Sequence, residues 1–228
     1  MDRIEEALKA PYEERNKMQF EQQKAMPEEF LEKGAASHQQ YEKSLHDPTA
    51  GRKKKLFSEI PHLHGKRIEL KELRLPDAPA LAELTGSPDV YRYLPTFLFE
   101  KKYDDARTVI ERLYSEAWKD SIILGVFMDE AFCGLAEMYG FRDPIHKISV
   151  GYRLLERCWG QGIATEALGL MVDYLYGETD IEIITASTMV ENRASANVLM
   201  KNGFSLVSHA VGEDWGYGSP TIADKWIR

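Results

Sequence analysis

The turn at residues 157–164 constrains the fold more than any other part of the sequence. The segment before it, 147–155, alternates as a strand does, and the segment after it repeats apolar residues at helical spacing: Ala164, Ala167, Leu168, Met171, Val172 and Leu175. Gly160 and Gly162 let the backbone approach a ligand closely, and free amides at a helix start attract phosphate. The pattern predicts a phosphate-binding turn, with a plain tight turn as the alternative.

Spacing separates this turn from two common nucleotide-binding loops. It lacks the Gly-x-x-x-x-Gly-Lys-Ser/Thr pattern of NTPases, and Thr165 stands where a dinucleotide fingerprint has its third glycine. A dinucleotide fold also needs an acidic residue at the end of the next strand, whereas Glu191 comes only after the following loop. Both nucleotide folds are therefore disfavoured.

From residue 66 onward, the chain alternates between strand and helix patterns. Ile68 and Leu70 mark a first strand, and further strands are expected at 121–128, 131–139, 147–155, 181–189, 204–210 and 221–227. Asp77 should cap a helix that ends at Gly86, and Ser87-Pro88 should start a short one. Longer helices are predicted at 106–117 and 164–175, and a short helix at 194–201. Asp129-Glu130 predicts a tight hairpin although the turn lacks glycine.

Residues 1–60 differ from the domain predicted at 61–228. Pro27 and Gly34 frame one short helix, and Ser37 with Gln40 starts another, but apolar residues are too sparse to enclose a core. We expect a helical arm that packs on the domain or bridges a homodimer, with a free tail as the alternative.

Composition limits the partners and the compartment. A net charge of −8 argues against nucleic acid held by a broad basic surface. Cys133 and Cys158 are too few for a disulfide framework, and His62-x-His64 is only a pair, so neither a disulfide nor a metal site is predicted. No stretch is long and apolar enough for a membrane span or a signal peptide. The expected location is cytoplasmic, without a membrane partner.

Two motifs together resemble the GNAT acetyltransferases. Arg157, Gly160 and Gly162 fill the fixed positions of their acetyl-CoA loop, and the run from Trp159 to Leu168 is similar to the RimJ/RimL branch. Downstream, the branch's Asn-x-x-Ser-x-x-x-Leu-x-Lys-x-Gly-Phe signature is matched by Asn192, Ser195, Leu199, Lys201, Gly203 and Phe204. The resemblance covers roughly residues 66–228 and leaves out the arm.

The resemblance implies a fold and a cofactor site. The fold would be α/β, more strictly α+β: a twisted, mixed, mostly antiparallel sheet of six or seven strands flanked by helices. Acetyl-CoA would be the co-substrate, without a metal. The implied CoA-binding residues are Leu154 and Leu155, whose strand would pair with pantetheine; Arg157, Gly160, Gln161, Gly162, Ile163 and Ala164, which would cradle the pyrophosphate; and Asn192 and Ser195 on the CoA arm. For Asn192 and Ser195 the alternative is a turn residue and a helix cap.

The catalytic residues are less evident, because this sequence departs from the family. Many RimJ/RimL-like chains have Glu where Ser149 stands, and many other GNATs have Tyr where Leu199 stands. Amine attack on a thioester needs a group that removes a proton. Glu137, on the neighbouring strand, is the best candidate base, with an exposed structural carboxylate as the alternative, and Ser149 could orient a water or the amine.

The implied function is transfer of an acetyl group from acetyl-CoA to a primary amine, on a protein N-terminus or a small molecule, by direct attack in a ternary complex. Two alternatives stay open. One is a non-catalytic acyl-CoA-binding module, suggested by the missing Glu and Tyr. The other is an enzyme that uses the same loop for a different nucleotide.

Overall fold

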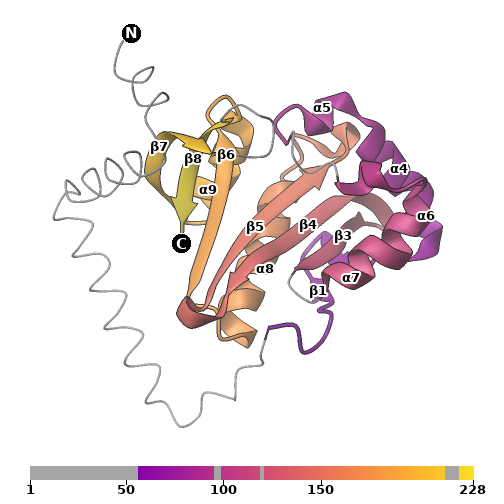
Figure 1. Ribbon diagram of the computed structural model, residues 1–228, viewed down its shortest axis with the longest axis horizontal. Helices are drawn as coiled ribbons and strands as arrows, with labels where there is room; N and C mark the ends of the chain where they lie inside the picture. Colours follow the sequence, from indigo (N-terminus) through magenta and orange to yellow (C-terminus); the bar gives the residue numbers. More distant parts are fainter. Residues whose placement is uncertain (1–55, 95–98, 119–120, 214–220) are drawn as a thin grey trace, which may run out of the picture. The chain divides into compact units, whose positions relative to one another are not determined.

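The computed structural model describes residues 56–94, 99–118, 121–213 and 221–228 (Figure 1). The chain separates into two units, Met1–Arg52 and Lys53–Arg228, and the account below concerns the second. The strands of this unit are β1 (Leu63–His64), β2 (Ile68–Lys71), β3 (Ile122–Met128), β4 (Ala131–Arg142), β5 (Lys147–Leu154), β6 (Ile183–Met189), β7 (Ser205–Glu213) and β8 (Thr221–Ile227).

All eight strands form one sheet in the order β1-β2-β3-β4-β5-β6-β8-β7. Neighbouring strands are antiparallel except β5 and β6, which are parallel and joined through a helix. The mixed, mostly antiparallel sheet is thus confirmed, with one strand more than expected. The additional strand is β1, which has two residues and lies in a segment that carries no strand pattern of its own.

The β3–β4 hairpin forms at the predicted turn. Met128 pairs with Ala131, so Asp129 and Glu130 are the two loop residues. Both have positive φ, 48° and 67°, as a type I′ turn requires. Side chains rarely adopt this conformation, but the right-handed twist of the two strands selects it.

The helices are α4 (Ala78–Gly86), α5 (Pro88–Tyr91), α6 (Ala106–Thr108), α7 (Ser115–Ala117), α8 (Ile163–Glu178) and α9 (Arg193–Lys201), with 3-10 turns at Leu75–Asp77, Phe99–Lys102, Asp143–Ile145 and Glu156–Cys158. The continuous helix predicted at 106–117 is interrupted, because Val109–Tyr114 forms a π-helix between α6 and α7. Ser87 caps α5 as predicted, accepting from the Val90 amide at 3.3 Å. Asp77 occupies the N-cap position of α4 as predicted, but its carboxylate makes no capping bond there and accepts instead from the Arg74 amide, at 2.7 Å.

The core lies on both faces of the central strands. Seven consecutive residues of β4, from Phe132 to Met138, are buried, so both faces of this strand are covered. Helix α8 packs along β2, β4 and β5 with the apolar face predicted from the sequence, except that Ala164 is only partly buried. In Figure 1 helices α4 to α7 gather beside β3 and β4, at the opposite side of the sheet from β7 and β8.

Residues 56–60, the last five of the predicted arm, are described and belong to the folded unit. Leu56 is buried in the core, and the Phe57 ring meets Trp118 and Phe141 edge-on at centroid distances of 6.1 and 5.7 Å. The rest of the predicted arm lies outside the described residues and stays a prediction. None of the described helices is long and apolar enough to span a membrane. The cytoplasmic location also stays a prediction.

Candidate functional site

A gap opens where the two parallel strands part. Strands β5 and β6 pair at only three positions, from Lys147–Ile183 to Ser149–Thr185, and then diverge (Figure 1). A cavity of about 770 Å³ lies there, lined by β5 from Ser149 to Leu154 and by Ala186, Ser187 and Thr188 of β6. Beyond their last pair, the backbone amides and carbonyls on the facing edges of β5 and β6 border this gap. An extended ligand that contains amides could pair with them as a strand would.

The predicted phosphate-binding turn forms one wall of the cavity. Gly160 and Gly162 both have positive φ, 72° and 79°, which explains the two glycines. Gly162 is the N-cap of α8, and its carbonyl accepts from the Glu166 amide at 3.1 Å. The amides of Ile163, Ala164 and Thr165 therefore belong to the first turn, where a helix offers no backbone acceptor. These three residues line the cavity, so the turn fits the pyrophosphate of a coenzyme A thioester.

The side chains of Arg157 and Gln161 support this turn through contacts outside the cavity. The Arg157 guanidinium contacts Glu83 of α4 and donates to the Phe132 carbonyl at 3.4 Å. The Gln161 side chain donates to the Arg157 carbonyl at 2.6 Å. Neither residue lines the cavity, unlike Gly160, Gly162, Ile163 and Ala164. Their predicted contacts with pyrophosphate stay predictions.

Sequence reasoning missed Arg67, in the β1–β2 turn. Its guanidinium donates to the Gln161 carbonyl at 2.9 Å and to Glu166 at 3.0 Å, and its amide donates to the other Glu166 oxygen at 2.8 Å. Burial alone would raise the pKa of Glu166, but the hydrogen bonds from Arg67 outweigh it and lower the pKa. Arg67 thus ties the phosphate turn to β2. No local pattern could have indicated a contact across more than ninety residues of chain.

The two leucines at the end of β5 face different ways. Leu154 lines the cavity, and its carbonyl accepts from the indole of Trp159 at 2.8 Å. The Leu155 amide donates to the Cys133 carbonyl at 2.8 Å, on the β4 side of the strand, and its side chain is buried. The pantetheine contact predicted for the Leu155 amide does not fit this geometry. The corresponding prediction for Leu154 does.

Asn192 and Ser195 lie on the opposite wall, at the start of α9. Asn192 caps the helix by accepting from the Ser195 amide at 3.1 Å, so the cap expected as the alternative is present, on Asn192, and both residues also line the cavity. The Ser195 hydroxyl is 2.8 Å from the hydroxyl of Tyr152 on β5. Burial raises the pKa of Tyr152 to about 12, so this phenol keeps its proton near neutral pH. The pair joins α9 to β5 across the gap.

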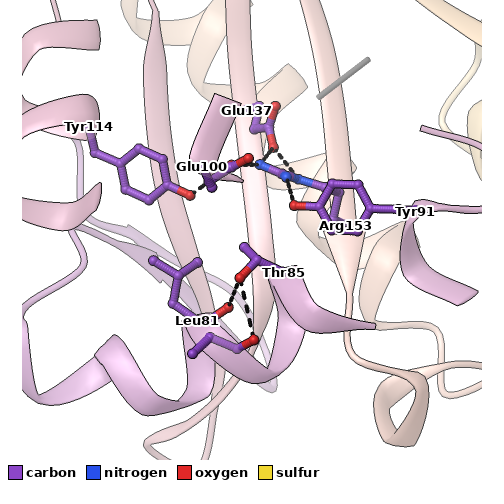
Figure 2. Close-up of polar contacts among 8 residues, drawn as sticks. Leu81, Thr85, Tyr91, Glu100, Tyr114, Glu137 and Arg153 are labelled. Atoms are coloured by element: carbon purple, nitrogen blue, oxygen red, sulfur yellow. Dashed lines mark hydrogen bonds and ion pairs between the residues drawn. The ribbon is translucent and has the colours of Figure 1, made fainter. Parts of the chain in front are cut away.

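Glu137 belongs to a buried polar network beside the cavity (Figure 2). Its Oε1 accepts from Arg153 Nε at 2.8 Å, and Arg153 also bonds to the hydroxyl of Tyr91 at 2.6 Å and to Glu100 Oε1 at 2.8 Å. Tyr114 donates to the same Glu100 oxygen at 3.1 Å. Of these five residues, only Glu137 and Arg153 line the cavity. The alternative of an exposed structural carboxylate is therefore wrong, because Glu137 is buried and ion-paired.

Ser149 stands at the point where the strands part. Its hydroxyl is 2.9 Å from that of Thr185, the last residue of β6 that pairs with β5. Ser149 lines the cavity on the same strand as Arg153, and Glu137 lies opposite Gly151 between them. The structure thus brings the two predicted catalytic residues to one cavity. Leu199, which replaces the family tyrosine, is buried, as is Cys158.

Comparisons with known proteins agree with this geometry. The model of the acetyltransferase (GNAT) domain matches residues 67–205. The uncharacterized N-acetyltransferase p20 of Bacillus licheniformis is 24% identical over 167 residues, which cover 72% of this chain and 93% of the relative.

Two solved structures illustrate the shared fold. RimJ of Mycobacterium smegmatis, in complex with CoA-disulfide, has a TM-score of 0.65 and 19% identity over 74% of this chain and 87% of that one. Spermidine N-acetyltransferase of Vibrio cholerae, with CoA and spermine, has a TM-score of 0.60 and 18% identity over 71% and 95%. Since the GNAT domain model spans more than half of the residues, this chain belongs to the GNAT family of acetyltransferases.

Proposed function

We propose that this protein transfers an acetyl group from acetyl-CoA to a primary amine, on a protein N-terminus or a small molecule, by direct attack in a ternary complex. The observation that carries the proposal is the gap between β5 and β6, which joins a phosphate-binding turn to a buried carboxylate within one cavity. Relatives described as acting on spermidine or as RimJ support an amine acceptor without naming one.

Different walls of the cavity would bind different parts of the thioester. The turn from Gly160 to Ala164 offers amides and a helix N-terminus to the pyrophosphate, and Leu154 offers edge groups to the pantetheine. Asn192 and Ser195 would contact the CoA arm from α9. An unpaired amide of β5 would stabilise the charge on the thioester oxygen as the amine attacks. Much of the rate would come from holding the two reactants in this geometry.

Glu137 and Ser149 would act on the acceptor. An ammonium group must lose a proton before it can attack, and a carboxylate within hydrogen-bond reach can take it. Both contacts from Arg153 fall on Glu137 Oε1, which leaves Oε2 as the oxygen to receive that proton. Ser149, fixed by Thr185, would orient the amine or a water between it and the base.

A non-catalytic acyl-CoA-binding module is the second candidate, because this chain has Ser149 and Leu199 at two positions that often carry catalytic groups. The two functions predict different behaviour toward amines. An enzyme releases free CoA from acetyl-CoA only when a suitable amine is present, whereas a binding module does not release it at all. An assay of CoA release over a panel of peptide N-termini and small amines decides between them.

The cofactor site has its own test. Gly162→Glu puts a bulky negative group beside the turn, where a Cβ already meets Arg67 Nη2 at 3.3 Å. Acetyl-CoA affinity should fall at least about tenfold, measured by calorimetry. Gly162→Ala is the control, because it has the same positive-φ strain without the size or charge, and it should retain more of the affinity. Unchanged binding by folded Gly162→Glu would show that the pyrophosphate lies elsewhere.

A further inference from the structure

The β1–β2 hairpin gathers three side chains that could ligate a metal. His64 lies directly opposite Glu69, and His62 lies two residues earlier, just before the two-residue strand β1. The two imidazole rings are 4.1 Å apart between centroids. His62 Nε2 is 3.0 Å from Glu69 Oε2, and His64 Nδ1 is 3.8 Å from Glu69 Oε1. One ligand atom from each of the three residues lies within 4.8 Å of the other two.

The structure assigns a binding site for Zn²⁺, or a chemically similar divalent transition metal, to His62, His64 and Glu69. Two imidazoles and one carboxylate are ligands that zinc accepts, with water in the fourth position. Mg²⁺ and Ca²⁺ prefer sites made of oxygen alone, so they fit poorly. Ligand atoms around tetrahedral zinc lie about 3.3 Å apart, which follows from bonds of about 2.0 to 2.1 Å. Rotations of these exposed side chains can supply the remaining contraction.

Lys71 would compete with a metal ion for the carboxylate of Glu69. Its ammonium lies 3.0 Å from Glu69 Oε2, the oxygen that also faces His62. A glutamate carboxylate offers two oxygens to a cation, and the other one, Oε1, faces His64. The Lys71–Glu69 pair is partly exposed to solvent, with side-chain exposures of 29% and 41%, and ion pairs near the surface contribute little energy. A divalent ion can therefore displace the lysine.

The site lies outside the acetyl-transfer cavity but next to its support. None of the three residues lines the cavity, so the metal would take no part in the chemistry. The hairpin turn between them, however, holds the phosphate-binding turn through Arg67. Gly65 in the same turn packs so closely that a Cβ would come within 2.7 Å of Glu166. Metal binding would fix the short edge strand β1 to β2 and hold this support in place.

The test is calorimetric titration of the full chain with ZnCl₂, and it does not depend on the acetyl-transfer proposal. The parent should bind one ion. Affinity should fall at least about tenfold in His64→Ala and in Glu69→Ala, because each loses a direct ligand. Lys71→Gln should bind zinc more tightly, since the competing ammonium is gone. His209→Ala is the matched control: it removes another exposed histidine beside a carboxylate, Asp224, and should change nothing.

Thermal melts supply the second readout. Zinc should raise the melting temperature of the parent and of His209→Ala, but not of His64→Ala, because an ion that binds only the folded state stabilises it. The proposal is overturned if the parent binds no zinc, if binding survives both ligand substitutions, or if Lys71→Gln fails to tighten it. Circular dichroism of each variant confirms that loss of binding is not loss of folding.

Discussion

Arg153 is the residue that holds together the buried polar network beside the cavity. Burial by itself would lower its pKa, but Glu137 and Glu100 outweigh that effect, and the pKa is raised. Its guanidinium contacts both carboxyl groups, and Glu100 Oε2 has no hydrogen-bond partner among the described residues. Such a cluster is costly to break, so it fixes Glu137 within the cavity wall.

Glu137→Gln tests the base at this position. The amide keeps the shape and still accepts from Arg153, but it cannot take a proton. The rate of acetyl transfer should fall by about a hundredfold while the KM for acetyl-CoA changes little. Glu100→Gln is the control, because it makes the same change on the same guanidinium outside the cavity. Equal losses in both variants, or a loss confined to acetyl-CoA affinity, would assign Glu137 to the network rather than to the chemistry.

The roles of single residues were predictable where the backbone conformation or a helix end restricts the residue type. Gly160, Gly162 and Asn192 occupy positions that need positive φ or a cap, and both needs leave a local signal. Leu155 shows the limit, since adjacent amides of a strand point to opposite sides and a sequence does not say which neighbour each one meets. Arg67 and the Arg153 network depend on distant segments and leave no local signal.

At the scale of elements, hydrophobic periodicity predicted whether a segment forms a strand or a helix where its own sequence decides this. Strand β4 and helix α8 were found because long apolar patterns are distinctive. Strand β1 has only two residues and exists because β2 pairs with it. The π-helix at Val109–Tyr114 keeps Val109 and Ile110 buried, although the spacing suggested an unbroken α-helix. Packing, rather than helix propensity, decided the form of that segment.

The segment 56–60 makes a testable element, because Leu56 and Phe57 pack on the domain. A chain that lacks residues 1–60 loses both contacts, whereas one that lacks residues 1–52 keeps them. The longer deletion should be less stable than the shorter one by on the order of 2–4 kcal/mol, the value of burying two large apolar side chains. Urea melts of the two truncated proteins measure the difference.

The shorter deletion addresses the predicted arm by itself. If the arm packs on the domain or bridges a homodimer, removing residues 1–52 should lower the melting temperature or change the mass in solution. A truncated protein that equals the parent in melting temperature, mass and activity would identify the segment as a tail. Two deletions that melt alike would show that Leu56 and Phe57 contribute nothing.

At the scale of the whole molecule, sequence patterns alone did not determine the order of the strands. Strand β8 lies between β6 and β7, so the last two strands in space are reversed relative to the chain. Hydrophobic alternation indicates which face of a strand is buried but not its neighbour. The family resemblance supplied the sheet architecture, and it implied that the strand ending at Leu154 and Leu155 pairs with pantetheine, for which the gap beside β5 leaves room.

Buried tyrosines should make the fold sensitive to alkali. Burial raises the pKa of Tyr91, of Tyr152 and of Tyr174 to about 12, against about 10 in an unfolded chain. Between about pH 10 and 12 the native state therefore holds more protons than the unfolded state, so stability falls as the pH rises. Each such tyrosine contributes a slope of up to about 1.4 kcal/mol per pH unit.

Urea melts at pH 9, 10 and 11 measure this loss. Tyr174→Phe should fall less steeply than the parent above pH 10, because one buried phenol no longer titrates. An unfolding free energy that stays constant from pH 9 to 11, or an equal slope in Tyr174→Phe, would contradict the assignment.

Trp159 gives the molecule an optical reporter of its own. Its side chain lines the gap with nearly half of its surface exposed, held by the hydrogen bond to Leu154. Of the other tryptophans that the structure describes, Trp226 is buried and Trp118 is partly buried, so their surroundings depend less on the gap. A thioester that enters between β5 and β6 would exclude solvent from the Trp159 indole, and the fluorescence emission should move to shorter wavelength. Binding can then be followed without a label, and Trp159→Phe should remove the signal.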